Sequence, residues 1–261
     1  MCSLGREAFA DTVCLQFAMA TRTNHTSRPK LAIIEHSRVK AELLGGFLTS
    51  RRNFEVVAVA KDAVAGQEMI GCVNPDLVVA ALVMPDFYAT GMIAGLREAT
   101  AAPIIGTITH CNEYLAYALT QVRCHGIYWD AVDGLDELLR IVDRVRLGQP
   151  AISASLLREQ AAWRRNPNYF PKMLSRREQD VLICISRALT NDEIGRQLNI
   201  SPGTVQSHRK MIMEKMGFHG TPKLIDYAMR AGFRHAPLPC VPLSATEPDG
   251  SRLEMAQVMA V

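Results

Sequence analysis

Short apolar runs alternate with amphipathic stretches over the first part of the chain, from Leu31 to Gly148. The apolar runs are rich in Val and Ile and too short for helices, and they fall at residues 31–35, 55–60, 77–82, 104–109 and 127–129. The stretches between them are predicted helices: residues 39–50, 63–71, 90–99, 113–122 and 135–147. Strands of nearly continuous hydrophobicity indicate a sheet that is covered on both faces. The pattern predicts an α/β domain over residues 29–148, with a five-stranded parallel sheet.

The rest of the chain divides into a linker, a second domain and two ends. Its 261 residues, 48% of them hydrophobic, can supply the cores of two modest domains. A Gly-Gln-Pro stretch at 148–150 ends the last helix of the first domain, and the polar segment 149–171 is interpreted as an interdomain linker. Residues 172–235 form the second domain. Residues 1–28 and 236–261 lack periodicity, so we predict that both ends are mobile.

Several classes of protein and site are disfavoured. The apolar run at residues 13–20 is short and follows acidic residues, so we predict neither a signal peptide nor a membrane span, and a cytoplasmic protein. Seven cysteines without a CxxC pair suit reduced thiols. The pairs His110-Cys111 and Cys124-His125 have zinc-ligand chemistry, but the predicted strands place them at opposite edges of the sheet. We therefore predict no metal, no cofactor and no catalytic residue.

Residues 172–235 have the pattern of four successive helices. Ser175 with Glu178, and Thr190 with Glu193, are capping boxes that each begin a helix. A turn at residues 199–202 then places a proline at the first position of a third helix. The domain carries 11 Lys and Arg against 6 Asp and Glu, an excess of five positive charges in a chain whose net charge is +3. This basic character is what a nucleic-acid-binding domain needs.

The third and fourth helices each have a distinct apolar side. On the third helix the 3.6-residue period gathers Val205, His208, Ile212 and Met216 on one side, and Gly203, Gln206, Ser207 and Lys210 on another. The polar side is free to meet DNA, whereas His208 is interpreted as a packing residue. A fourth helix begins at Thr221 and presents a stripe of Leu224, Ile225, Ala228 and Met229. That stripe can be buried in its own domain or serve as a dimerisation surface.

About 60 residues of this domain resemble the LuxR/NarL family of helix-turn-helix regulators. The resemblance rests on L-S-R-R-E-Q-D-V-L (174–182), N-D-E-I-G-R-Q-L-N-I-S-P-G-T-V-Q-S-H (191–208) and K-M-G (215–217). It implies an all-α, four-helix DNA-binding domain in which Gln206, Ser207 and Lys210 face the major groove and Thr204 and Arg209 reach phosphates. The family often has lysine at the position of Gln206. A glutamine amide there favours adenine.

The first domain resembles the receiver domain of response regulators, a flavodoxin-like (CheY-like) doubly wound fold. In receivers an acidic pair after the first strand holds Mg²⁺, an aspartate ends the third strand and accepts phosphate, a Thr or Ser follows the fourth, and a Lys ends the fifth. The segment P-D-L-V-V-A-A-L-V-M-P (75–85) puts Ala81 at the phosphoacceptor position. The other positions of the pocket hold Glu35 and His36, Thr107 (or Thr109 in a shifted register) and Asp130.

The loss of the phosphoacceptor, the second acid and the lysine together predicts a pseudo-receiver. Asp86, the nearest other acceptor, is interpreted as a surface charge. The leading hypothesis is a sequence-specific transcription regulator that binds two-fold symmetric sites in double-stranded DNA as a homodimer. A partner protein or a small ligand would then control it in place of Asp phosphorylation. The alternative is an interaction module whose pseudo-receiver binds a histidine kinase or another regulator and acts through a heterodimer.

Overall fold

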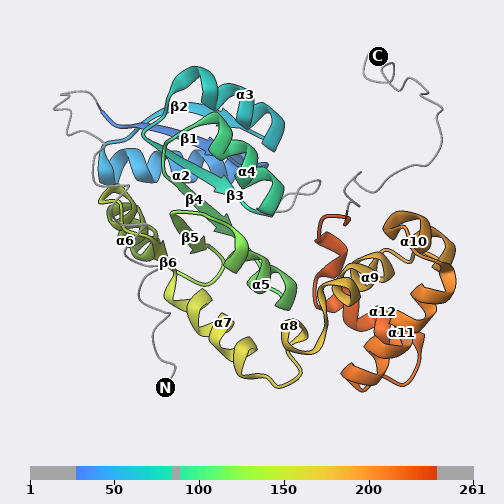
Figure 1. The fold of residues 1–261 in the computed structure, drawn as a ribbon. Helices are drawn as coiled ribbons and strands as arrows, with labels where there is room; N and C mark the ends of the chain where they lie inside the picture. The colour runs from blue at the N-terminus through green and yellow to red at the C-terminus, as the bar shows by residue number, and fades with distance from the viewer. Residues whose placement is uncertain (1–27, 84–88, 240–261) are drawn as a thin grey trace, which may run out of the picture.

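The protein is described here by a computed structural model that covers residues 28–83 and 89–239 (Figure 1). The predicted N-terminal extension before Arg28, the loop aspartate Asp86 and the tail beyond Pro239 lie outside the described residues. The tail was expected to begin at residue 236, but Ala236 is fully buried and its carbonyl accepts a hydrogen bond from Arg187 at 2.5 Å. Ala236 is therefore packed with the second domain, one residue past its expected end.

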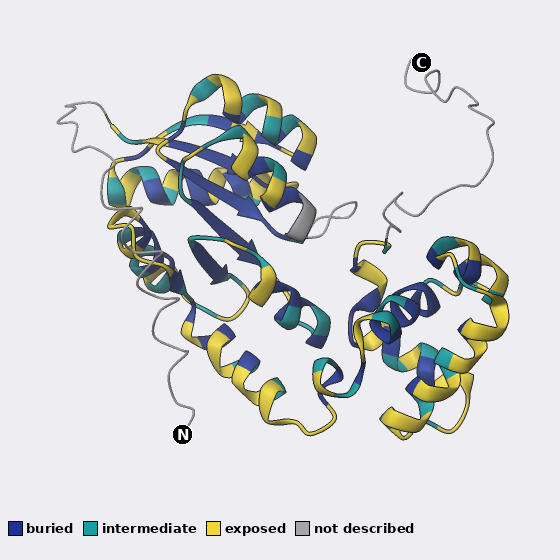
Figure 2. Cartoon of the chain, in the orientation of Figure 1, coloured by how far each residue is buried: buried dark blue, intermediate teal, exposed yellow. Residues whose placement is uncertain are grey.

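The α/β domain has a parallel sheet in the order β2-β1-β3-β4-β5-β6. The strands are β1 (Lys30–Ile34), β2 (Glu55–Ala60), β3 (Leu77–Ala81), β4 (Ile104–Ile108), β5 (Gly126–Trp129) and β6 (Ala151–Ile152). The first five strands were predicted, and the short sixth strand was not. The helices are α2 (Arg38–Arg52), α3 (Ala63–Val73), α4 (Ala89–Ala99), α5 (Glu113–Gln121) and α6 (Leu135–Arg146). All residues of β3 and β4 are buried, as strands between two helical layers must be (Figure 2).

Side-chain caps fix where three of these helices begin. Ser37, Asp62 and Asn112 each accept a hydrogen bond from the backbone N–H three residues further on, at 3.4, 2.8 and 2.8 Å. Each of these caps stands just after a strand, at the carboxyl edge of the sheet. The helix starts are thus set at the edge where the functional residues of such folds gather.

The segment at 149–171, expected to be an interdomain linker, contains regular structure. β6 pairs in parallel with β5, and α7 (Ala154–Arg165) follows it. The Gln160 amide donates to the Ala116 carbonyl at 3.1 Å, which ties α7 to α5. The polar composition of this segment reflects a half-exposed helix on the outside of the sheet, and residues 166–169 form the irregular connection from this helix to α8.

The second domain, called the helical domain below, is built from short helices. They are α8 (Phe170–Met173), α9 (Arg176–Ser186), α10 (Asn191–Leu198), α11 (Pro202–Met216), α12 (Thr221–Arg230) and the 3₁₀ turn η1 (Phe233–His235). Both predicted capping boxes are confirmed, because Ser175 and Thr190 each exchange hydrogen bonds with the glutamate three residues on. A Cβ at Gly195 would lie 2.7 Å from the Ile200 carbonyl oxygen. Glycine is therefore required where α10 turns into α11.

Within the described residues, no helix is both long enough and apolar enough to cross a membrane.

Candidate nucleic-acid interface and receiver pocket

Helix α11 presents the polar face that its sequence predicts. Val205 and Ile212 are fully buried in the core of the helical domain, which fixes the rotation of the helix about its axis. The side turned to solvent carries Gly203, Thr204, Gln206, Ser207 and Lys210, all of which are exposed. Figure 2 shows the same exposed stripe along α11, on the part of the helical domain that faces away from the sheet. This face is therefore exposed to solvent in the described structure.

The exposed side chains of α11 are held only by weak local bonds. The Gln206 amide oxygen accepts a hydrogen bond from the Asn191 side chain of α10 at 3.0 Å. Thr204 bonds the capping hydroxyl of Ser201 at 2.8 Å, and the Ser207 hydroxyl donates to the backbone at 3.1 Å. Lys210 lies 3.8 Å from Glu214, and both groups are highly exposed. Such bonds are worth little in water, so these groups can exchange them for contacts to bases and phosphates.

Arg209 points inward, unlike the other residues predicted to contact DNA. Its guanidinium donates to the Leu189 carbonyl at 3.0 Å and is half-buried, and this burial lowers the pKa of Arg209. This hydrogen bond ties α11 to the loop between α9 and α10. Contact between Arg209 and a phosphate stays a prediction, and it requires the side chain to leave this carbonyl. His208 is half-buried beside the core, which agrees with its interpretation as a packing residue.

The predicted dimerisation stripe on α12 is split. Leu224 and Ala228 are fully buried in the core of their own domain. Of the two predicted roles, these residues have burial in their own domain, so they are no longer proposed as dimer contacts. Ile225 is half-buried, while Met229 is 46% exposed, and the two stay predicted dimer contacts.

The helical domain contacts the α/β domain through a buried carboxylate. Glu113, the first residue of α5, accepts hydrogen bonds from the Phe170 N–H at 3.1 Å and from the Tyr227 hydroxyl at 3.0 Å. Next to it, the Tyr114 N–H donates to the Ala231 carbonyl at 2.8 Å. Burial raises the pKa of Glu113, against the opposing effect of its two hydrogen-bond donors. Burial, followed by the charge of Glu113, likewise raises the pKa of the Tyr227 hydroxyl.

Aromatic rings surround this carboxylate and close the junction between the domains. Phe170 packs edge-on against Phe233 at 4.7 Å and against Tyr117 at 5.2 Å, measured between ring centroids. Tyr114 lies 5.2 Å from Phe233. Such contacts add to the burial of apolar area. The junction was not predicted, because each of its residues is an ordinary helix or turn residue in the sequence and only the fold brings them together.

The predicted phosphoacceptor position is an apolar position within the sheet. Ala81 ends β3, is buried, and pairs in register with Thr107 on β4. The Thr107 hydroxyl is buried without a hydrogen-bond partner among the described residues. Thr109, the alternative in the shifted register, is the threonine that joins the polar groups of the pocket. The residue at Ala81 offers no atom that can accept a phosphoryl group.

A lysine that the sequence analysis did not select organises the pocket. The Lys40 ammonium lies 2.5 Å from an Asp130 oxygen and 3.1 Å from a Glu35 oxygen, and it donates to the Thr109 hydroxyl at 3.1 Å. Lys40 stands in the first turn of α2, where side chains point back towards the helix start and therefore over the end of β1. That direction is the signal that could have identified it.

The residues of this pocket do not fit the Mg²⁺ that the receiver fold implies. The Lys40 ammonium stands between the two carboxylates that face the pocket, and Ala81 removes a third. His36 replaces the second acid and pairs with Glu35 at 2.9 Å. Among the described residues, no group of three or more His, Cys, Asp or Glu side chains is placed to hold a metal ion. The His110-Cys111 and Cys124-His125 pairs add none, and burial raises the pKa of both thiols to about 12.

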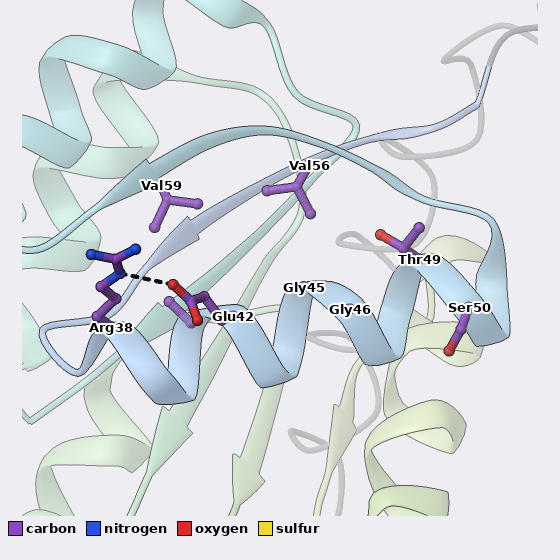
Figure 3. Close-up of a pocket in the computed structure, with 9 residues that line it drawn as sticks. Arg38, Glu42, Gly45, Gly46, Thr49, Ser50, Val56 and Val59 are labelled. Atoms are coloured by element: carbon purple, nitrogen blue, oxygen red, sulfur yellow. Dashed lines mark hydrogen bonds and ion pairs between the residues drawn. The ribbon is translucent and has the colours of Figure 1, made fainter.

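Two grooves of about equal volume flank α2, and one of them reaches Lys40 and Asp130. The other lies away from the Lys40 cluster. It has a volume of about 610 Å³ and lies between α2 and the edge strand β2 (Figure 3). Gly45 and Gly46 open it on the helix side, and Val56 and Val59 line the strand side. Its two charged residues, Arg38 and Glu42, pair with each other at 2.8 Å. Thr49 and Ser50 add two hydroxyl groups to a lining that is otherwise largely apolar.

Comparisons with known proteins agree with both domains. Residues 172–228 match the family model described as bacterial regulatory proteins of the luxR family. The oxygen regulatory protein NreC of Staphylococcus aureus, in strains JH9 and NCTC 8325 among others, is 29% identical over 216 residues, which are 77% of this chain and 97% of NreC.

Solved structures of similar fold include complexes with DNA. A structure of two RcsB dimers bound to two parallel DNAs has a TM-score of 0.55 at 19% identity, and the match covers 78% of this chain and 99% of that chain. RcsB from Salmonella enterica serovar Typhimurium bound to promoter P1flhDC has a TM-score of 0.56 at 18% identity, with the same coverage. The parallel sheet followed by a small helical domain is thus shared with these proteins.

Proposed function

We propose that this chain, a DNA-binding response regulator of the LuxR/NarL type, reads two-fold symmetric promoter sites as a homodimer and is controlled independently of aspartyl phosphorylation. The observation that carries the proposal is the exposed polar face of α11, which stays uncovered while the helical domain is docked on α5. In this conformation α11 can meet a major groove without separation of the helical domain from the α/β domain.

The chemistry of that face supports sequence reading by a few side chains. Gln206 and Ser207 can reach base edges, Lys210 and Thr204 can neutralise or bond phosphates, and the excess of five positive charges in residues 172–235 adds non-specific attraction. With one amide oxygen lone pair held by Asn191, Gln206 keeps both amide N–H groups and a second lone pair for an adenine edge.

The pocket of the α/β domain supports the second part of the proposal. Ala81 cannot be phosphorylated, and the neighbouring polar groups are committed to one another through Lys40. The dimer draws support from the structure of two RcsB dimers bound to two parallel DNAs, and from the exposed Met229 on α12. An input would then act as a partner protein or a small ligand.

The test is a selection of genomic DNA fragments by the purified full-length protein at near-physiological salt, with no phosphodonor present. The expected result is enrichment of a two-fold symmetric site, protected by a protein whose mass in the complex is that of two chains. A Gln206→Ala/Lys210→Ala double variant serves as the control and should enrich nothing. Enrichment that requires a phosphodonor would contradict the proposed independence, and enrichment of single half-sites by one chain would contradict the dimer.

A further inference from the structure

Three separate strand ends meet at the Lys40 ammonium. Glu35 follows β1, Thr109 follows β4 and Asp130 follows β5, and the ammonium contacts all three side chains at distances of 2.5 to 3.1 Å. We propose that Lys40 is a built-in replacement for the divalent cation of a receiver pocket, so that this pocket neither needs nor admits Mg²⁺. A side chain of the protein thereby holds the carboxyl edge of the sheet together.

Burial makes the positive charge necessary. Glu35 is 2% exposed, and a carboxylate at that depth is tolerated only when it is paired and hydrogen-bonded. One of its oxygens accepts the Ser37 N–H at 3.0 Å and lies 2.9 Å from the His36 ring nitrogen, and the other faces Lys40. The second oxygen has no hydrogen bond among the described residues, so the Lys40 ammonium at 3.1 Å is what balances its buried charge.

The geometry leaves little room for a second cation. Mg²⁺ requires carboxylate oxygens at about 2.0–2.1 Å and usually takes only one or two carboxylates, with waters completing its shell. Here both candidate carboxylates already contact the ammonium, and Asp130 also accepts from Thr109 at 3.4 Å. A tethered ammonium cannot dissociate as a metal ion can. The ammonium therefore stays close to both carboxylates in the folded domain.

This inference rests on the proposed function in one respect: the signal that controls the regulator must act at a site other than this pocket. Its test measures cation binding and folding, with no DNA present, so that it can fail while DNA reading stands, and the reverse.

The experiment is a titration of the full-length protein with Mg²⁺ and, separately, Mn²⁺. Trp129 reports on the pocket because its indole N–H donates to the Thr109 carbonyl at 3.3 Å, and a Trp163→Phe background removes the chain's other tryptophan. The unsubstituted pocket should show no change in Trp129 fluorescence or melting temperature. Lys40→Ala frees Glu35 and Asp130, so it should bind Mn²⁺ and gain about 3 °C or more at roughly tenfold excess over its dissociation constant.

Lys61→Ala, at an exposed lysine beyond the end of β2, is the matched control and should behave as the unsubstituted protein does. A cation response of the unsubstituted pocket equal to that of Lys40→Ala would overturn the proposal. So would the lack of any response in both proteins, since the two carboxylates would then not form a cation site at all.

A second measurement covers the case in which Lys40→Ala does not fold. Adding Glu35→Gln removes the buried charge, so the Lys40→Ala/Glu35→Gln variant should recover a cooperative unfolding transition with a higher melting temperature than Lys40→Ala. Absence of this recovery would show that Lys40 does not act as the counter-ion of Glu35, which also overturns the proposal.

Discussion

The helical domain has two faces that differ in what they touch. The α11 face is exposed, and its polar side chains make hydrogen bonds, as far as the structure describes the chain, to α10 and to their own helix. The face formed by α12 and η1 is buried against α5, where a carboxylate and four aromatic rings fill the contact. The α11 face is free to bind a ligand, whereas the face of α12 and η1 is already covered by α5 of the same chain.

On the proposed function, this difference means that docking of the helical domain on α5 and DNA reading by α11 do not compete in one chain. A buried junction usually suggests that the domain is held away from its ligand, but here the contact uses a surface other than α11. The predictions that follow perturb one face at a time and ask whether the other responds. They run from the largest expected effect to the smallest.

Substitution of Gly232, at the docked face, is expected to cause the largest loss of stability. Its φ is +92°, and a Cβ there would overlap the Asn112 amide across the junction. Gly232→Ala should lower the free energy of unfolding by about 2–4 kcal/mol, from backbone strain together with displacement of Asn112. Denaturant unfolding measures the loss, and hydrogen exchange at the Tyr114 amide, which donates to Ala231, reports the loosened junction.

Gly217→Ala is the matched control, because φ is +69° at Gly217 and a Cβ there meets nothing within 4 Å. It isolates the backbone cost, about 1 kcal/mol. Equal losses in the two variants would show that Asn112 yields freely and that the junction is soft. The DNA affinity of Gly232→Ala should stay within about twofold of the unsubstituted chain, a change of under 0.5 kcal/mol; a larger rise would mean that the docked face does restrain reading.

Gln206 carries the next effect, which is confined to the open face. Gln206→Ala should weaken binding to the selected site by roughly 10- to 100-fold, the discrimination of about 1–3 kcal/mol that a bidentate contact gives, and should relax the base preference at one position of each half-site. Competition binding with single-base variants of the site measures both. Gln121→Ala, at an exposed glutamine of α5, is the control and should leave affinity and preference unchanged. An equal loss of affinity for all base variants of the site would instead show that Gln206 contacts the DNA backbone.

The open face could be predicted from sequence because its signals are local. Capping residues lie three positions from their partners, Pro202 occupies the first turn, and helical periodicity alone separates Val205 and Ile212 from the polar side. The α/β order of the first domain was likewise predicted from strand-length apolar runs. The predicted ends of the strands were nearly right where a hydrophobic run has clear ends. The strand β6 was missed because a strand of two residues has no recognisable pattern in the sequence.

The docked face and the pocket cluster could not be predicted in the same way. Glu113 and Tyr227 are 114 residues apart and meet only in the folded chain. Lys40 appears in the sequence as an ordinary helical lysine, and the family pattern directed attention to the end of β5, where Asp130 stands. The family resemblance predicts a phosphate contact for Arg209, but position on a helix gives the direction of a Cβ and not the path of a long side chain. In the free protein that path is set by the Leu189 carbonyl.

The pH dependence of stability tests how the docked face is held. The folded-state pKa of the Glu113 carboxyl lies above its ordinary value of 4.5, mainly through burial, so the folded protein holds this proton more tightly than the unfolded chain does. Its contribution is complete below pH 4.5 and declines as pH rises through the raised pKa. Glu113→Gln should therefore gain stability relative to the unsubstituted chain as pH rises from 4.5 to 7, measured by denaturant unfolding. A difference that does not change over this range would remove Glu113 as the titrating group.

Lys210 should show a smaller effect on the open face, visible in the salt dependence. Lys210→Ala should reduce the slope of log affinity against log salt by about one ion's share if its ammonium contacts a phosphate. Within the described part of the chain its charged contact is Glu214, at 3.8 Å between highly exposed groups, so the free energy of unfolding should not change measurably. Lys61→Ala on the α/β domain controls for net charge. An unchanged slope would leave Lys210 as a solvated side chain.

The smallest expected effect is none at all, and it concerns whether the pocket can signal to either face. Ala81→Asp restores the receiver's acceptor residue, but its carboxylate would lie in a buried strand end beside Thr107, with the nearby ammonium already committed to Glu35 and Asp130. Incubation with a small-molecule phosphodonor should give no stable phosphoryl adduct by intact-protein mass spectrometry, and DNA affinity should be the same with and without the donor. Ala81→Asn, which has the shape of aspartate without its nucleophile, separates any loss of folding from a loss of reactivity. An adduct on Ala81→Asp that also changes DNA affinity would show that the pocket remains coupled to the helical domain, and the docked face would then be its route.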